Sequence, residues 1–379
     1  MVYAPAMSSP SPVDPPAPTP LAVRLGAFAV VALFVLALAG AAEWFVRRRA
    51  EAKYGFANAD HLACQNPEIG TFTLCPNLSL PRLTSNALGF RGGPIADPKP
   101  AGTVRLAFLG GSTTLAIEAS GDDKTWVERT GAMLRARYPD ARFDVINGGV
   151  AGHTLADMHK NWRRVAPLRP DVVVLYEGTN DLTQDTRRLA KAEGLIQSDP
   201  ARPSWLAERS MLYGLVEKNV RILLRSQTGD ANTPTLRYDA DQVSQGFKQR
   251  YAALVADVKA AGVPLVVLVT FAPRIRRDQP PEVQQAAMIT TRYYAPFLDV
   301  AGALDGFDAY NRRVRELAAE SGALLVDDLA HVPGDGVHYT DSVHMSDAGL
   351  EKQAERVVAA LVEAPAFRAL VATSTSAAR

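Results

Sequence analysis

The chain has 379 residues, of which 47% are hydrophobic and 21% charged, an ordinary composition for a globular protein with one large domain or two small ones. Its formal net charge of +1 excludes a basic field over the whole chain, so we predict no nucleic-acid partner. The same balance gives no indication of a strongly acidic or strongly basic partner.

The amino-terminal part of the chain predicts a membrane anchor. Residues 1–20 are rich in proline, serine and alanine and are expected to form a disordered tail. Residues 25–42 carry no charge, and with their neighbours they can cover the roughly 20 residues that a bilayer requires. We therefore predict a transmembrane helix over residues 21–46, with Trp44 and Phe45 at the headgroup level. A cleaved signal peptide is the alternative, but the long preceding tail and its weak positive charge favour an uncleaved anchor.

The orientation of this anchor is left open by two opposing signals. Arginines at 47–49 follow the helix and only Arg24 precedes it, so the positive-inside rule favours a cytoplasmic catalytic domain. Residues 47–102 form a juxtamembrane segment that holds both cysteines, Cys64 and Cys75. Two unrelated thiols and a disulfide that closes a short loop are both open interpretations. A disulfide would indicate an oxidising compartment, on the other side of the membrane.

From residue 103 to residue 365, apolar runs typical of buried strands alternate with helical patterns. This alternation predicts an α/β fold with a doubly wound parallel sheet. The expected strands cover 104–109, 143–147, 171–176, 264–271 and 323–327, and the expected helices cover 125–138, 155–165, 241–261, 305–321 and 347–363. Residues 366–379 are expected to be a tail.

Two stretches interrupt this pattern. Residues 182–240, with a helix-like part near 204–226, and residues 272–300 are long insertions after the third and fourth strands. Both would emerge beyond the carboxyl ends of the strands, where long loops tend to control access to a site. Packing against the membrane or the juxtamembrane segment is the alternative.

A candidate nucleophile follows the first predicted strand. Gly110, Gly111 and Ser112 form a strand-to-helix turn in which the glycines leave the serine hydroxyl uncrowded. Serine is a poor nucleophile until a neighbouring base takes its proton. Most Gly-Gly-Ser tripeptides are simple turns or helix caps, so Ser112 needs support from other segments.

A carboxylate–imidazole pair near the end of the chain can supply that base. Asp341 and His344 lie three residues apart, so the carboxylate can orient one ring nitrogen while the other faces Ser112. Asp335 and His338 repeat this spacing six residues earlier. We prefer the second pair because a predicted helix begins directly after it.

Donors for an oxyanion are expected where the second and third strands end. The backbone N–H groups of Ser112 and Gly149 and the side-chain amide of Asn180 are the candidates. Because open α/β sheets bind ligands beyond the carboxyl ends of their strands, we expect these groups to meet in one crevice. Asp181 is expected to hold its loop through local hydrogen bonds, and Asp347 can cap the helix that follows His344.

Three other kinds of site are less compatible with the residues. The glycines of residues 147–152 are one residue short of a dinucleotide fingerprint and follow the second strand instead of the first. The two Asp-x-x-His pairs can be read as metal ligands, but this leaves the upstream segments unexplained. Thr114 replaces the final glycine of a Gly-x-Ser-x-Gly elbow, which disfavours an α/β-hydrolase nucleophile. We expect no cofactor and no metal.

Taken in order, four segments resemble the blocks of the SGNH (GDSL-like) hydrolase superfamily. The segments are Gly110-Gly111-Ser112, Asn147-Gly148-Gly149 with Gly152, Gly178-Thr179-Asn180-Asp181, and Asp341-Ser342-Val343-His344. The resemblance covers roughly residues 103–363 and implies a five-stranded flavodoxin-like sheet. It also implies Ser112 as nucleophile, Gly149 and Asn180 as oxyanion donors, and Asp341 with His344 as the proton-handling pair.

One residue departs from the motif that names this superfamily. Gly111 stands where the motif has aspartate, which can alter how the nucleophile turn is held. The anchor and the stretch Asn-Ala-Leu-Gly-Phe-Arg at 86–91 resemble membrane-tethered bacterial members. Such members commonly act on envelope lipids or glycans, which implies an extracytoplasmic, periplasmic catalytic domain.

The sequence thus predicts a membrane-anchored serine esterase or O-acyltransferase. Ser112 would attack an ester of a small molecule, lipid or glycan, and water or a sugar hydroxyl would resolve the acyl-enzyme. A catalytically inactive envelope-binding or assembly module with the same fold is the alternative, because a fold alone does not prove an activity. The acyl group, the alcohol partner and the oligomeric state are not determined by the sequence.

Overall fold

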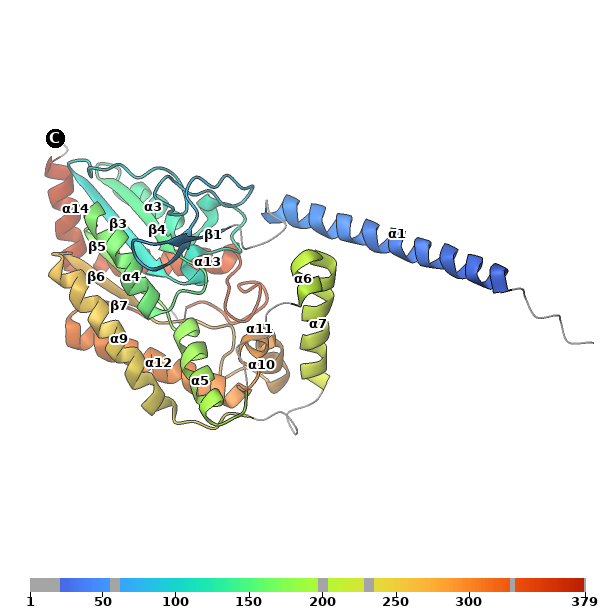
Figure 1. Cartoon of the computed structure of the whole chain (residues 1–379). Coiled ribbons are helices and arrows are strands. Elements are labelled where there is room, and N and C mark those ends of the chain that lie inside the picture. The colour runs from blue at the N-terminus through green and yellow to red at the C-terminus, as the bar shows by residue number, and fades with distance from the viewer. Residues whose placement is uncertain (1–20, 55–61, 197–203, 228–234, 328–330, 378–379) are drawn as a thin grey trace, which may run out of the picture.

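Five parallel strands form the central sheet (Figure 1). The computed structural model describes residues 21–54, 62–196, 204–227, 235–327 and 331–377. In spatial order the strands are β4 (Arg142–Gly149), β3 (Thr103–Gly110), β5 (Val172–Tyr176), β6 (Leu265–Val269) and β7 (Leu324–Val326). The order reverses direction once, beside β3, so the predicted doubly wound, flavodoxin-like sheet is confirmed.

Helices cover both faces of the sheet, and for this reason every side chain of β5 and β6 is buried. One face carries α3 (Trp126–Arg137), α13 (Asp347–Glu363) and α14 (Pro365–Ala377), and the other carries α4 (Leu155–Val165), α9 (Ala240–Ala260) and α12 (Val300–Ser321). Each helix predicted from the apolar pattern is present, and only α12 begins several residues earlier than expected. Asp299 caps α12 by accepting a hydrogen bond from the N–H of Gly302, which explains its earlier start.

The predicted carboxyl-terminal tail contains helix α14. Its side chains Phe367 and Val371 are buried, and the ring of Phe367 stacks on Phe143 of β4 with the centroids 6.3 Å apart. Burial of an aromatic ring on the sheet gives this short segment the tertiary contacts that a helix of its length needs.

Shorter elements occupy the predicted insertions and the nucleophile turn. The first insertion holds α6 (Trp205–Arg209) and α7 (Met211–Gln227), and the second holds α10 (Pro281–Ala287) and α11 (Ile289–Tyr294). Helix α5 (Thr179–Ala192) follows β5 after two residues, so the first insertion begins beyond it. The 3-10 turns η2 (Asp122–Lys124) and η3 (Ala166–Leu168) and the four-residue helix α2 (Ser112–Leu115) complete this part of the fold.

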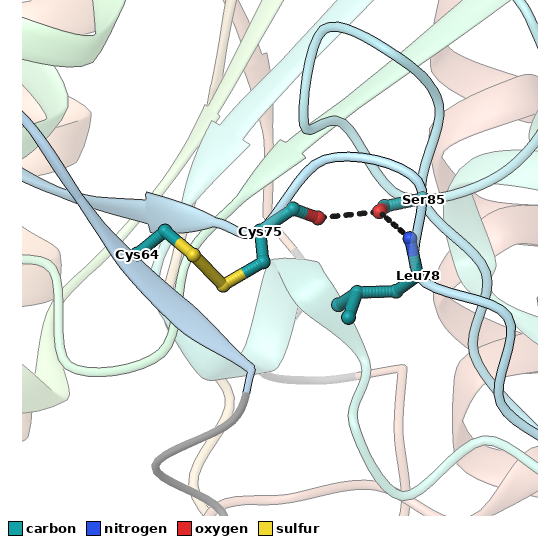
Figure 2. The surroundings of a disulfide bond; sticks show 4 residues. All are labelled: Cys64, Cys75, Leu78 and Ser85. Atoms are coloured by element: carbon teal, nitrogen blue, oxygen red, sulfur yellow. Dashed lines mark hydrogen bonds between the residues drawn. A yellow bond between two sulfur atoms is a disulfide. The ribbon is translucent and has the colours of Figure 1, made fainter.

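The predicted juxtamembrane segment contains a small antiparallel hairpin closed by a disulfide (Figure 2). Strands β1 (Ala63–Asn66) and β2 (Thr71–Leu74) pair, and the bond joins Cys64 to Cys75 just beyond β2. The carbonyl oxygen of Cys75 accepts a hydrogen bond from the Ser85 hydroxyl, which in turn accepts one from the Leu78 N–H. Of the two interpretations left open by the sequence, the structure contains the disulfide.

Helix α1 (Leu21–Tyr54) extends from the body of the protein (Figure 1). Within it, residues 25–52 are long and apolar enough to cross a membrane. Their large apolar side chains are exposed, with Phe28 74% and Leu36 67% accessible. The helix continues past the predicted end at residue 46 because nothing in the charged stretch that follows breaks it.

Candidate active site

Ser112 lies at the carboxyl end of β3, as the first residue of α2. Its backbone N–H has no acceptor within the helix because it belongs to the first turn. The turn rests on the fully buried indole of Trp126, whose Nε1 donates to the carbonyl of Thr113 at 3.2 Å. The turn that carries the predicted nucleophile is therefore supported by the core.

The structure brings Ser112, His344 and Asp341 into one chain of hydrogen bonds. The Ser112 Oγ lies 2.7 Å from His344 Nε2, and His344 Nδ1 lies 2.8 Å from Asp341 Oδ2. Asp341 Oδ1 also accepts the backbone N–H groups of Val343 and His344. Burial raises the pKa of the Asp341 carboxyl, but these hydrogen bonds and the nearby imidazole hold it below its ordinary value. The carboxylate can therefore stay ionised while it orients the ring.

The other Asp-x-x-His pair has the same local geometry in a different place. His338 Nδ1 lies 2.8 Å from Asp335 Oδ1, but no described serine is within hydrogen-bond distance of its second ring nitrogen. The four side chains of the two pairs form separate units. Within the described ranges, no three His, Cys, Asp or Glu side chains are grouped to hold a metal ion.

The second insertion positions the loop that carries Asp341 and His344. The hydroxyl of Ser342 accepts the N–H groups of Thr290 and Thr291 at the start of α11, at 3.0 and 3.2 Å. Its carbonyl accepts the N–H of Arg274 at 2.9 Å. Residues 272–300 therefore support this loop, in addition to any role in access.

Asn180 is held beside the nucleophile turn by a glutamate that the sequence did not single out. Glu177 Oε1 accepts the N–H groups of Gly178 and Asn180, each at 2.9 Å, and the Asn180 amide donates to the His153 carbonyl at 2.9 Å. Glu177 is 1% exposed. Burial and the nearby Asp181 carboxylate raise its pKa to about 8. The one sequence signal for it was a charged residue directly after a buried strand.

The Glu177 carboxyl also explains the glycine at position 111. A Cβ atom placed on Gly111 would lie 2.5 Å from Asn180 Nδ2 and 2.8 Å from Glu177 Oε2. Both distances are shorter than real Cβ contacts, so any side chain at 111 would displace Asn180 or Glu177. In this chain the carboxyl of Glu177 thus stands beside the nucleophile turn where the motif aspartate would project.

The geometry of Gly149 differs from the role predicted for it. Gly149 ends β4 inside the core, and its N–H already donates to Asn147 Oδ1 at 3.1 Å. A Cβ there would lie 2.1 Å from the backbone nitrogen of Leu115, so the glycine is needed for close packing against α2. Gly152, in the next turn, is exposed with φ +78, and its N–H has no acceptor among the described residues.

Arg91, from the Asn-Ala-Leu-Gly-Phe-Arg stretch, supports the opposite end of α2. It is 3% exposed and donates to the carbonyls of Leu115 and Ala116 at 2.8 and 2.6 Å. Asp122 accepts from its Nε at 2.7 Å and balances its charge. Ala116 is left-handed, with φ 55, so these bonds hold a turn that alanine does not favour. The juxtamembrane segment is therefore part of the site's framework.

Two further predictions concerned the acidic residues near these loops. Asp181 is buried in the first turn of α5, accepts the Leu155 N–H at 2.8 Å and pairs with Arg250, so in place of the expected local hydrogen bonds it joins α5 to α4 and α9. The expected cap at Asp347 is wrong, because Ser346 caps α13 through the Gly349 N–H. Asp347 instead accepts the backbone N–H of Ser120 at 2.9 Å.

The raised pKa of Glu177 predicts a pH-dependent stability. Its pKa of about 8 in the folded state exceeds the ordinary 4.5, so the folded protein binds more protons between these values. We therefore expect the contribution of Glu177 to the free energy of unfolding to fall as the pH rises from about 5 to 8, which lies between the unfolded and folded pKa values. Relative to Glu177→Gln, wild type should lose about 1 kcal/mol or more over this range.

Urea unfolding of the full chain in detergent, followed by tryptophan fluorescence, measures this difference. Glu363→Gln is the matched control, because Glu363 is exposed at the end of α13 and should leave the wild-type pH dependence unchanged. Parallel pH curves for wild type and Glu177→Gln would contradict the prediction.

Comparison with known proteins gives one family match. The GDSL-like lipase/acylhydrolase family matches residues 108–352. No curated protein matches the chain significantly. Among solved structures, an acetylxylan esterase from Geobacillus stearothermophilus is 20% identical, with 68% of this chain and 93% of that chain covered and a TM-score of 0.41. LAE5, an alpha/beta hydrolase enzyme from the metagenome of Lake Arreo, Spain, is also 20% identical, with coverages of 68% and 94% and a TM-score of 0.40.

Proposed function

The chain belongs to the GDSL-like lipase/acylhydrolase family of serine ester hydrolases, and from this premise we propose that it is a membrane-anchored esterase or O-acyltransferase with Ser112 as nucleophile. The observation that carries the proposal is the continuous hydrogen-bond chain from Ser112 Oγ through His344 to Asp341. In this arrangement the base can reach the hydroxyl, and its other nitrogen is fixed by a carboxylate.

The reaction has two halves that use the same groups. Ser112 Oγ attacks the ester carbonyl carbon while His344 Nε2 takes its proton. When the tetrahedral intermediate collapses, His344 gives this proton to the departing alcohol oxygen, and the acyl group stays on Ser112. Water or a sugar hydroxyl then attacks the acyl carbon while His344 Nε2 takes its proton. As the acyl–Oγ bond breaks, His344 returns this proton to Ser112 Oγ, and the acid or the new ester leaves. Asp341 remains ionised throughout and orients the imidazole.

The developing oxyanion needs donors that are free to point at it. We assign this role to the N–H of Ser112 and to the second N–H of the Asn180 amide, since the first is given to the His153 carbonyl. In place of Gly149 we propose the N–H of Gly152, since the Gly149 N–H is already used by Asn147. Gly152 precedes His153, whose carbonyl accepts from Asn180, so the segments that carry Gly152 and Asn180 adjoin each other.

We place the catalytic domain outside the cytoplasm, acting on acyl esters of envelope lipid or glycan. The Cys64–Cys75 disulfide supports this side, because such bonds persist in oxidising compartments. Arg47 is one of the arginines that, by the positive-inside rule, favour a cytoplasmic domain. It forms an ion pair with Glu43 and donates to the carbonyl of Arg209. Its charge is therefore partly compensated at the membrane boundary.

A fluorophosphonate probe tests the nucleophile. Wild type should become labelled and Ser112→Ala should not, because the probe reacts with an activated serine hydroxyl. Ser120→Ala is the matched control, since Ser120 is exposed and hydrogen-bonds to Asp347 and not to His344. Equal labelling of wild type and Ser112→Ala would refute the assignment. A wild-type protein that neither labels nor hydrolyses short esters would favour the inactive module.

A further inference from the structure

Helix α7 exposes apolar side chains along one face. Tyr213, Val216, Val220 and Leu223 follow one another at spacings of three and four residues, which places them on one side of the helix. Their side chains are 41%, 50%, 45% and 53% exposed. Soluble surfaces rarely expose such an apolar stripe.

The start of α7 is fastened to the membrane helix. Glu43 of α1 accepts the backbone N–H groups of Met211 and Leu212 at 3.0 and 2.8 Å and the hydroxyl of Ser210 at 2.8 Å. The two N–H groups belong to the first turn of α7, where they have no acceptor within the helix, so Glu43 caps α7 from another helix. Figure 1 shows α7 below α1 and running across its direction.

The position of Glu43 sets the level of α7 relative to a bilayer. Residues 25–42 carry no charge and rise about 27 Å as a helix, close to the roughly 30 Å of a hydrocarbon core. Glu43 is the first charged residue after this run, and a charge is costly inside hydrocarbon. Trp44 and Phe45 follow, 63% and 58% exposed, and aromatic rings favour the headgroup region. The amino terminus of α7 therefore lies at the membrane boundary.

We propose that the exposed face of α7, defined by Tyr213, Val216, Val220 and Leu223, lies in the membrane surface and contacts lipid of the same leaflet that α1 enters. This inference rests on the membrane anchor in the proposed function. A helix tied to the boundary and running across the anchor has the orientation of an interfacial helix, whose apolar side enters the acyl region.

The neighbouring helix α6 has the composition of an interfacial segment. Its Trp205 is 65% exposed, and the guanidinium of Arg209 lies 4.4 Å from the centre of the Trp205 ring. Aromatic and basic side chains together suit the headgroup region of a bilayer. The lipid surface therefore continues from α7 onto α6.

This contact gives the proposed enzyme a route to esters in the membrane. Helix α7 packs against α11, and the first N–H groups of α11 bind the Ser342 hydroxyl, two residues before His344. The lipid-facing helix thus touches the element that supports the Asp341–His344 loop. Substrates carried in or on the leaflet are the class that this arrangement would present to Ser112.

Nitroxide labels on the full chain in phosphatidylcholine–phosphatidylglycerol vesicles test the inference. Val216→Cys and Val220→Cys are compared with Lys352→Cys, an exposed position on α13. The native cysteines are paired with each other, so the label attaches only to the introduced cysteine. Collision with oxygen reports lipid and collision with a water-soluble nickel chelate reports water. We expect the oxygen-to-chelate ratio at the two α7 positions to be about threefold or more above that at 352.

A label at Val31→Cys, within the uncharged run 25–42 of α1, distinguishes failure of the lipid contact from failure of the anchor. A lipid signal at 31 with a water signal at 216 and 220 would overturn the inference and leave the anchor intact. Water signals at all of these positions would refute the anchor as well. The spectra of labels at 216 or 220 on different molecules can also broaden one another while both oxygen and the chelate are excluded. This result would show that a second copy covers the face, and it would overturn the lipid assignment.

Discussion

Replacing His344 with alanine should lower kcat for a short acyl ester by about 10³- to 10⁵-fold, with KM changed only a few-fold. His344 Nε2 lies 2.7 Å from Ser112 Oγ and is the group placed to take its proton. The change removes a proton transfer that occurs in the transition state and not in substrate binding, so the loss should appear in kcat. Steady-state hydrolysis of a chromogenic acetyl ester measures both constants.

The chain contains its own control for this experiment. His338 makes the same contact with Asp335, at the same 2.8 Å, that His344 makes with Asp341. His338→Ala therefore removes an equivalent local pair without touching Ser112, and kcat should stay within a few-fold of wild type. Similar losses in the two variants would show that both changes act through the loop structure. A loss of kcat in His338→Ala alone would show that His338, and not His344, is the base.

The sequence predicted the parts of the fold that repeat a pattern. Buried parallel strands are continuous apolar runs, and the turns at their carboxyl ends are marked by glycines, so β3, β4 and β5 and the positions of Ser112 and Asn180 could be identified. The choice of His344 over His338 depended on the helix that follows it. The structure places His344, and not His338, beside Ser112.

Contacts between distant segments could not be predicted in this way. Arg91 lies 24 residues before Leu115, and only the folded chain shows that it binds the end of α2. Glu177 is one charged residue after an apolar strand, and its partners Gly178 and Asn180 become meaningful only once the turn is formed. Gly149 and Gly152 are both glycines of the same segment, and the sequence alone does not distinguish their roles. They differ because one packs against Leu115 and the other lies open in a turn.

Gly111→Asp, which restores the residue of the family motif, should reduce kcat/KM by about 10²-fold or more. The new side chain would start 2.5 Å from Asn180 Nδ2 and 2.8 Å from Glu177 Oε2. It would also place a second carboxyl against Glu177 in a buried site, where two like charges cannot both ionise. Gly93→Asp is the matched control, because Gly93 is exposed with no atom within 4 Å of its added Cβ and should keep wild-type activity.

The double variant Gly111→Asp/Glu177→Ala distinguishes crowding from a general loss of structure. Removing the Glu177 carboxyl frees the space that an aspartate at 111 would enter, where its oxygens can take over acceptance of the Gly178 and Asn180 N–H groups. We expect the double variant to regain about tenfold or more of the activity lost in Gly111→Asp, and to exceed Glu177→Ala alone. Strictly additive losses would mean that the two carboxyl positions are not equivalent, and that this chain holds its nucleophile turn by a different device from the motif aspartate.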